Sequence, residues 1–459
     1  MSSSLLGAAL LVGCADDPPN CRHRVCDINE ASCAEFVAEV ISCQRDAPLA
    51  IPTVRFSTAA EILAERDPAT QEELDFARDY WAGEALVGLM PANYDPADAA
   101  SDSLSGVLAQ YRAGTDEIVI ISDSDIDDPE LGYQVLVHEM LHAQQDVEYD
   151  LSALFDEYAT TFPRSLGLRA AVEGEASFYT TVAQLELDDL TADQVDWESY
   201  YWDWQNSAWL AARQSEVPSL DVMGLFPYAF GSEQVYRAWT AGGLEEVRDY
   251  VQHPPDSVRQ VMAGYAQRPP QVFNFDTELN PRAVPILPGH TYLSGGAQDS
   301  WLLNTMLQRT AGSLADWSLE VGKIEADHLS IWRDDTTGDR VAVWRLVGDR
   351  LALRDVLLGD GSQWAETSAN ATTHHMRPVG EDWILVATEA PTAVAVADSI
   401  TGWQSQDEAF ELAGLVRTSA PGDLVLPGPC HHHARHAPAT SHSAGDQNRG
   451  RPAPGAGSG

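Results

Sequence analysis

Cations are scarce in this chain. Its 459 residues include 27 lysines and arginines against 70 aspartates and glutamates, and Lys323 is the single lysine. The formal net charge of −43 repels a phosphate backbone, which argues against nucleic acid as a partner. Such a surface either favours cationic substrates or keeps a protein dissolved in salty surroundings, and the second reading is the simpler one.

Long apolar runs are also missing. After the first residues, no stretch approaches the roughly 18 to 20 apolar residues that a membrane-spanning helix needs. Residues 5–13 form a short apolar run that ends in small residues before Cys14, which predicts an export signal over 1–14. The letters "LVGC" resemble a bacterial lipobox. That resemblance implies a lipid anchor at Cys14 and an exported cell-envelope lipoprotein, periplasmic or on the outer surface. The alternative is an ordinary apolar leader.

Cysteines are few and cluster near the N-terminus. Cys21, Cys26, Cys33 and Cys43 lie in a cysteine-rich lead-in over residues 15–50. None of them forms the C-x-x-C spacing that is typical of structural zinc sites. The cluster therefore predicts two disulfides, with three possible pairings, rather than a zinc site. Disulfides are typical of exported proteins.

Composition along the chain predicts its domain organisation. Hydrophobic residues make up 44% of the chain, which is enough for a large core. We expect an α+β protein, with a helix-rich catalytic domain over 51–270 and a small α+β domain over 285–418. A proline-rich stretch without periodicity, about 268–290, separates them. The tail over 419–459, rich in Pro, Gly, Ala and His, is predicted to be disordered.

The spacing of apolar residues predicts individual elements. Three- and four-residue spacing favours helices, and alternation favours strands. Helices are predicted from about residue 56 to 86 in two pieces, over about 129–148, 164–187, 197–214 and 232–241, from 242 to a stop at Pro254, and over 297–313. A hairpin is predicted over 106–112 and 117–122, and two further strands lie between 327 and 347.

One apolar helix carries a metal-binding pattern. Residues 135–146 read "VLVHEMLHAQQD", in which His138 and His142 are four apart and therefore share one helix face. With Glu139 they form H-E-x-x-H, in which two imidazoles bind zinc and the glutamate is the general base. The surrounding residues are apolar up to Asp146, so the helix is predicted to be buried. Buried histidines beside a buried glutamate need a partner; a metal supplies one, and hydrogen bonds within the core are the alternative.

A third ligand is expected from another element, because hydrolytic zinc sites use three protein ligands and an open position for water. The segment "AAVEGEAS" offers Glu173 and Glu175. H-E-x-x-H followed by a helical glutamate resembles the gluzincin metallopeptidases. "VEGEAS" is similar to the N-E-G-x-A segment of their aminopeptidase branch, whose glutamate ligates zinc. The resemblance implies that Glu173 is the third ligand.

A closer resemblance covers most of the chain. Many secreted bacterial proteins combine HExxHAxQD with VEGxA, a later FPYxxG and a glycine-pair segment that ends in PPxS. This chain carries those motifs in the same order, at 138–146, 173–176, 226–231 and 242–257. The resemblance implies a zincin-like fold with a small C-terminal unit, and it indicates no substrate.

The predicted chemistry follows from the ligands. His138, His142 and Glu173 would bind Zn²⁺, which lowers the pKa of a bound water and polarises a carbonyl group. Glu139 would take the proton of that water and deliver it to the leaving amine.

Further residues are candidates for supporting roles. Tyr228, Tyr179 and His253 are candidate donors to the oxyanion, and each has a structural role as its alternative. Glu175 is predicted either to hydrogen-bond a ligating imidazole or to face solvent.

The sequence thus predicts an exported, lipid-anchored zinc metallopeptidase of the bacterial cell envelope, which acts on a peptide or protein substrate. The rival prediction is a catalytically inactive envelope binding or scaffold protein that keeps a zincin-like fold. The enzyme prediction requires that Glu173 reach the histidine pair and that a groove open onto the site.

Overall fold

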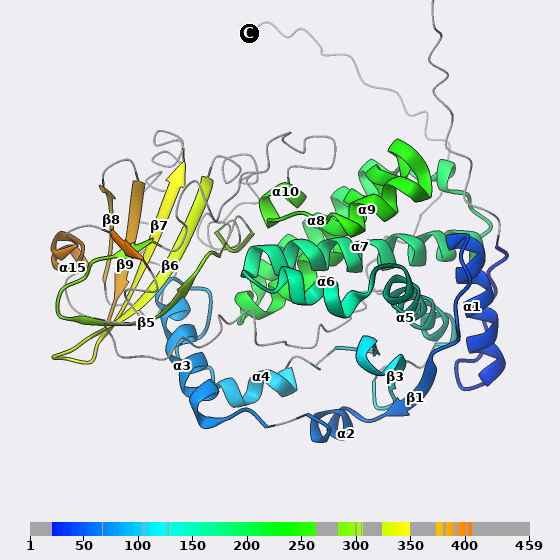
Figure 1. Cartoon of the computed structure of the whole chain (residues 1–459), viewed down its shortest axis with the longest axis horizontal. Helices are drawn as coiled ribbons and strands as arrows, with labels where there is room; N and C mark the ends of the chain where they lie inside the picture. Colours follow the sequence, from blue (N-terminus) through cyan, green and yellow to red (C-terminus); the bar gives the residue numbers. More distant parts are fainter. Residues whose placement is uncertain are drawn as a thin grey trace, which may run out of the picture.

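A computed structural model describes residues 21–262 apart from 67, 103, 105, 125 and 127, and then 283–298, 301–303, 305, 324–348, 373–379, 382–389, 393–400 and 403–405. A helical region and an antiparallel sheet lie side by side (Figure 1). Most of the helices precede the strands of the large sheet in the chain, which confirms the α+β class. The predicted signal over 1–14, including Cys14, and the tail over 419–459 lie outside the described residues.

Helices dominate the first 262 residues. Three predicted helices, at about 129–148, 164–187 and 197–214, are confirmed within two residues at each end. Among the helices described, none is both long and apolar enough to cross a bilayer. The helices are α1 Ala31–Arg45, α2 Ala59–Ala64, α3 Gln71–Leu86, α4 Pro96–Asp102, α5 Pro129–Tyr149, α6 Leu151–Tyr158, α7 Phe162–Leu187, α8 Trp197–Gln214, α9 Pro218–Gln252, α10 Val258–Met262 and α15 Ala393–Ser399.

The start of α5 follows from its first residues. The side chain of Asp128 accepts a hydrogen bond from the backbone N–H of Glu130 at 3.1 Å. Pro129 stands at the first helical position, where its missing N–H costs nothing. At the other end, Asp146 accepts a hydrogen bond from the backbone N–H of Leu151 at 2.9 Å, so the chain turns directly into α6.

Helix α9 differs from its prediction. It begins at Pro218 rather than at 232 and continues through Pro227, so the FPYxxG segment is helical. The second predicted helix, from 242, is joined to it across a break at Gly242 and Gly243. Gly243 has φ of 68°, a conformation that glycine adopts without steric cost.

A three-stranded sheet lies beside α5. The predicted hairpin is confirmed as β2 Ala109–Arg112 and β3 Glu117–Ile121, which pair antiparallel. A further strand, β1 Thr53–Ser57, pairs parallel with β3, so the helical pattern begins after this strand rather than at about 56.

The second sheet has five antiparallel strands in the order β5-β6-β7-β9-β8, and the two strands predicted between 327 and 347 are confirmed as β6 and β7. A short pair, β4 and β10, lies next to it. Of the helix predicted over 297–313, residues 301–303 and 305 are described and helical. The strands are β4 Ala283–Pro285, β5 His290–Gly296, β6 Ile324–Asp334, β7 Arg340–Gly348, β8 Thr373–Val379, β9 Asp382–Thr388 and β10 Trp403–Ser405.

Both faces of the five-stranded sheet are covered. On β7, Trp344 and Leu346 point into a core shared with α3, α8 and α9, whereas Val341 and Val343 point into a second core with α15. The alternation of strand side chains explains why such strands are apolar throughout. The sheet and the helices therefore share one continuous core, although the domain boundaries 51–270 and 285–418 stay predictions.

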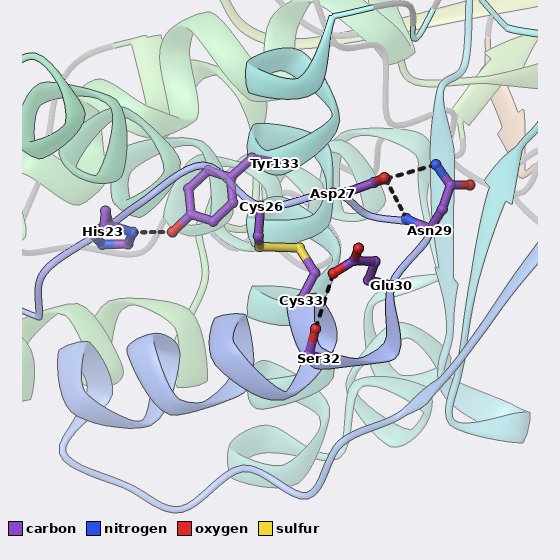
Figure 2. The surroundings of a disulfide bond; sticks show 8 residues. All are labelled: His23, Cys26, Asp27, Asn29, Glu30, Ser32, Cys33 and Tyr133. Atoms are coloured by element: carbon purple, nitrogen blue, oxygen red, sulfur yellow. Dashed lines mark hydrogen bonds between the residues drawn. A yellow bond between two sulfur atoms is a disulfide. The ribbon is translucent and has the colours of Figure 1, made fainter.

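The lead-in is cross-linked by disulfides and packs against α5. Its cysteines form the disulfides Cys21–Cys43 and Cys26–Cys33, which confirms two bridges and selects one of the three pairings. Figure 2 shows the second bridge beside Tyr133 of α5, whose hydroxyl lies 2.7 Å from Nδ1 of His23. Two disulfides indicate that this segment folds in an oxidising environment.

Candidate metal centre

Three predicted ligands meet where α5 and α7 cross. His138 and His142 lie one turn apart on α5, and Glu173 faces them from α7. Oε2 of Glu173 is 3.3 Å from Nε2 of His138 and 3.2 Å from Nε2 of His142. The two Nε2 atoms are 3.2 Å apart. These residues form a cluster able to hold a metal ion, as the sequence predicts.

The size of this triangle fits a small metal ion. In a tetrahedral site with ligands at 2.0–2.1 Å, neighbouring ligand atoms lie about 3.3 Å apart. The three separations in this cluster are 3.2, 3.2 and 3.3 Å. Two imidazole nitrogens and one carboxylate oxygen also form a donor set that zinc accepts. The residues present therefore fit a zinc ion with one position left open.

The electrostatics of the cluster favour a positive charge. Burial favours the neutral imidazole of His142, but the Glu173 carboxylate outweighs it and raises the pKa of His142 to about 9. Burial also acts to raise the pKa of Glu173, and the two histidines overcome it and hold that pKa far below its usual range. A metal cation would compete with a proton on His142 for this site, so metal binding there would release protons.

The centre is nearly closed to solvent. The side chains of His138, His142 and Glu173 retain 2%, 6% and 11% of their exposure. Glu139, the predicted general base, is 1% exposed, and its charge contributes to the raised pKa of His142. Interactions between charges are stronger in such a dry site than in water.

The three oxyanion candidates lie in different places. The ring of Tyr228, from α9, stacks on His138 with ring centroids 5.9 Å apart. Tyr179 lies instead under the guanidinium of Arg45, 5.0 Å from its ring centroid. His253 is exposed at the end of α9 and contacts Asp249. Tyr228 is therefore the candidate that the fold brings to the ligands.

Sequence reasoning missed Gln145, which contacts the Nδ1 side of the His142 ring. Oε1 of Gln145 lies 2.8 Å from Nδ1 of His142. Nε2 of Gln145 donates to Oε2 of Glu175, also at 2.8 Å. Glu175 is buried, so the solvent-facing alternative is wrong, and it reaches the imidazole through Gln145 rather than by the direct hydrogen bond of the other alternative. The three-residue spacing of His142 and Gln145 on one helix is the signal that could have shown this.

Close helix packing places Glu173 beside the histidines. A Cβ added to Gly174 would lie 2.3 Å from the carbonyl carbon of Gly231 on α9. A Cβ added to Gly231 would lie 1.9 Å from the backbone oxygen of Ala170 on α7. The glycines of the VEGxA and FPYxxG motifs therefore touch, and their lack of side chains lets α7 and α9 approach closely.

The chain has been compared with protein-family models, curated proteins and solved structures, and none of these comparisons finds a match. Ligands from two helices converge on one point, a carboxylate lies beside them, and a buried hydrogen-bond network lies behind His142.

Proposed function

We propose that this chain is an exported zinc metallopeptidase with a zincin-like catalytic domain, anchored to the bacterial cell envelope by a lipid at Cys14. The observation that supports it is the convergence of His138, His142 and Glu173 at separations suited to one ion. Three protein ligands leave a fourth position for water, and that open position is typical of catalytic zinc.

The surrounding side chains have distinct tasks in peptide hydrolysis. Bound zinc would supply a water of lowered pKa and polarise the scissile carbonyl. Glu139, next to His138 on α5, takes the proton of the attacking water and hands it to the leaving amine. Tyr228, stacked on His138, is the candidate donor to the developing oxyanion.

A second candidate is an envelope binding or scaffold protein that holds zinc without turnover. The observation in its favour is the closure of the centre, where Glu173 is the most exposed ligand at 11% of its side chain. The two candidates agree on metal binding and differ on hydrolysis.

The test combines metal content with hydrolysis, on the full chain after mild chelation of loose metal. The parent is expected to hold one tightly bound zinc and to cleave quenched fluorescent peptides of degenerate sequence. Glu139→Gln should keep the zinc and lose about 10²- to 10⁴-fold in rate, the usual contribution of a general base. The matched control is Glu157→Gln, an exposed carboxylate of α6, which should keep both.

Each outcome decides between the candidates. Zinc in the parent without any cleavage supports the binding protein. Equal cleavage by Glu139→Gln and parent overturns the assigned mechanism, and a folded parent without zinc overturns both candidates. The histidines at 431–436 are present in every variant, so zinc held there is unchanged in His138→Ala, whereas zinc at the centre is lost.

A further inference from the structure

Arg45 lies at the end of α1 and is 1% exposed. A buried guanidinium is costly unless acceptors surround it. Its NH1 group donates to Oε1 of Glu175. Its NH2 group donates to Oε2 of Glu148 and to the hydroxyl of Tyr149, both at 2.8 Å. The charge is thus balanced by two carboxylates, one of which belongs to the helix that carries Glu173.

From Glu175 the hydrogen bonds lead to the metal ligands. The second oxygen of Glu175 accepts from Nε2 of Gln145, which also donates to the backbone oxygen of Val172 at 2.8 Å. The oxygen of the same amide faces Nδ1 of His142 at 2.8 Å. Arg45 is therefore connected to a ligand through two side chains, all of them buried.

The chemistry of the groups determines which one donates and which one accepts in each of these hydrogen bonds. A guanidinium only donates hydrogen bonds, so the carboxylate of Glu175 accepts. An accepting carboxylate turns the NH₂ of Gln145 toward itself and leaves the amide oxygen for the imidazole. That oxygen only accepts, so Nδ1 of His142 carries the hydrogen and Nε2 presents its lone pair to the metal position. Arg45 thereby selects the tautomer that binds a metal.

The position of Arg45 is itself fixed by covalent and polar contacts. Cys43, two residues earlier, forms the disulfide with Cys21. NH2 of Arg248, from the glycine-pair segment, donates to the backbone oxygen of Arg45 at 2.6 Å. Arg248 also contacts Glu148 at 3.2 Å. The end of α1 is therefore held from both sides.

We propose that Arg45 is a positioning residue of the metal centre, which acts on His142 through Glu175 and Gln145, and that the Cys21–Cys43 disulfide holds Arg45 in place for this task. The inference rests on the proposed function, because it needs His142 to be a ligand. It predicts that zinc affinity depends on a residue outside the motif-bearing helices, and on the oxidation of the lead-in.

The effect on affinity follows from comparable contacts in other metal sites. Loss of a group that orients a ligating histidine typically weakens metal binding about 10- to 100-fold. We expect Arg45→Met to weaken zinc binding within that range and Arg45→Lys, which keeps a donor to Glu175, to recover part of it. Gln145→Leu should weaken it as much. Adding Arg45→Met to Gln145→Leu should cost little more, because both changes break the same chain.

The experiment is a chelator competition for zinc on the full oxidised chain, with the folded fraction of each variant measured by circular dichroism. Arg345→Met is the matched control. Arg345 pairs with Asp382 in the five-stranded sheet and lies over the ring of Trp403, so its loss also removes a partly buried pair and a ring contact. We expect it to lower thermal stability without changing zinc affinity.

The two disulfides supply a second comparison. The double variant Cys21→Ser/Cys43→Ser should weaken zinc binding several-fold. The double variant Cys26→Ser/Cys33→Ser should change zinc binding less than twofold. A parent that binds no zinc defeats the proposed function. A parent that binds zinc with the same affinity as Arg45→Met, or independent losses in the double variant, defeats the positioning role and leaves the proposed function standing.

Discussion

In two regions of the molecule a glutamate is buried next to a glycine, and the groups that surround the two glutamates differ. On α7, Gly174 and Glu175 lie where this helix meets α5 and α9. On α3, Gly83 and Glu84 lie where the helix meets the five-stranded sheet. Both carboxyl groups are essentially inaccessible, at 0% and 1% exposure.

The partners of the two carboxyl groups differ. Burial raises the pKa of Glu175, and the cation Arg45 opposes that rise. Burial raises the pKa of Glu84 to about 7, opposed by the Ser219 hydroxyl and the Tyr80 phenol, which carry no positive charge. An arginine beside a buried carboxyl group favours its ionised form, whereas hydroxyl groups supply no opposing positive charge. The candidate metal centre lies next to the first kind of site.

The two glycines also meet different neighbours. A Cβ on Gly174 would collide with the backbone of Gly231, and a Cβ on Gly83 would lie 2.1 Å from Cδ1 of Ile331. A helix backbone moves only if the whole helix moves, whereas an isoleucine can change its rotamer. An added methyl group is therefore tolerated less well at the α7–α9 contact than at the contact of α3 with the sheet.

The largest expected effect is at that contact. Gly231→Ala places a methyl group against the oxygen of Ala170, and we expect a loss of more than about 4 kcal/mol in the free energy of unfolding, the exceptional range for single changes. Urea titration followed by circular dichroism measures it. A loss below that of Gly83→Ala would reverse the comparison.

Removal of the charge from Glu175 comes next. Glu175→Gln leaves Arg45 without one of its two carboxylates in the core, and breaking such a buried pair costs about 3 to 5 kcal/mol. The urea midpoint at pH 7 should fall accordingly, with Glu157→Gln unchanged as the control. An unchanged midpoint would mean that Glu148 alone balances the arginine.

Replacing Glu84 should raise the free energy of unfolding, whereas replacing Glu175 should lower it. The size of the rise should depend on pH. The folded pKa of Glu84, about 7, exceeds the ordinary value of 4.5, so between those values the folded state holds a proton that the unfolded chain has lost. Stability therefore falls as pH rises through that window. Glu84→Gln should match the parent near pH 4 and exceed it by about 3 kcal/mol at pH 8. A constant difference across pH would show that Glu84 has no such shift.

The smallest change is expected from Gly83→Ala. The three atoms nearest to the new methyl group all belong to the side chain of Ile331, and overpacking of this kind costs about 1 to 3 kcal/mol. Combining it with Ile331→Val should restore part of the loss, as urea titration would show. If the smaller residue gives no recovery, the backbone of the sheet rather than the side chain limits the contact.

The local parts of the candidate metal centre were predictable. Helix spacing places His138 and His142 on one face, and Asp128 with Pro129 marks where their helix begins. The resemblance supplied Glu173. Its contact with the histidines depends on how α5 and α7 cross. The spacing of residues along one helix does not determine that crossing.

Non-local contacts account for what the sequence did not reveal. Strand β1 pairs with β3 across 64 residues, from Thr53 to Glu117, and its short apolar pattern alone is ambiguous. Arg45 belongs to the cysteine-rich lead-in, for which the sequence predicted disulfides but not the helix α1. No spacing rule connects that arginine to a ligand 97 residues away, His142.

We expect one zinc ion to occupy the crossing of α5 and α7. Anomalous diffraction at the zinc edge, from crystals of the zinc-loaded full chain, would locate it. The peak should lie about 2.0 to 2.2 Å from Nε2 of His138, Nε2 of His142 and a carboxylate oxygen of Glu173. A well-ordered crossing without a peak, with zinc found elsewhere such as at the histidines of 431–436, would contradict it.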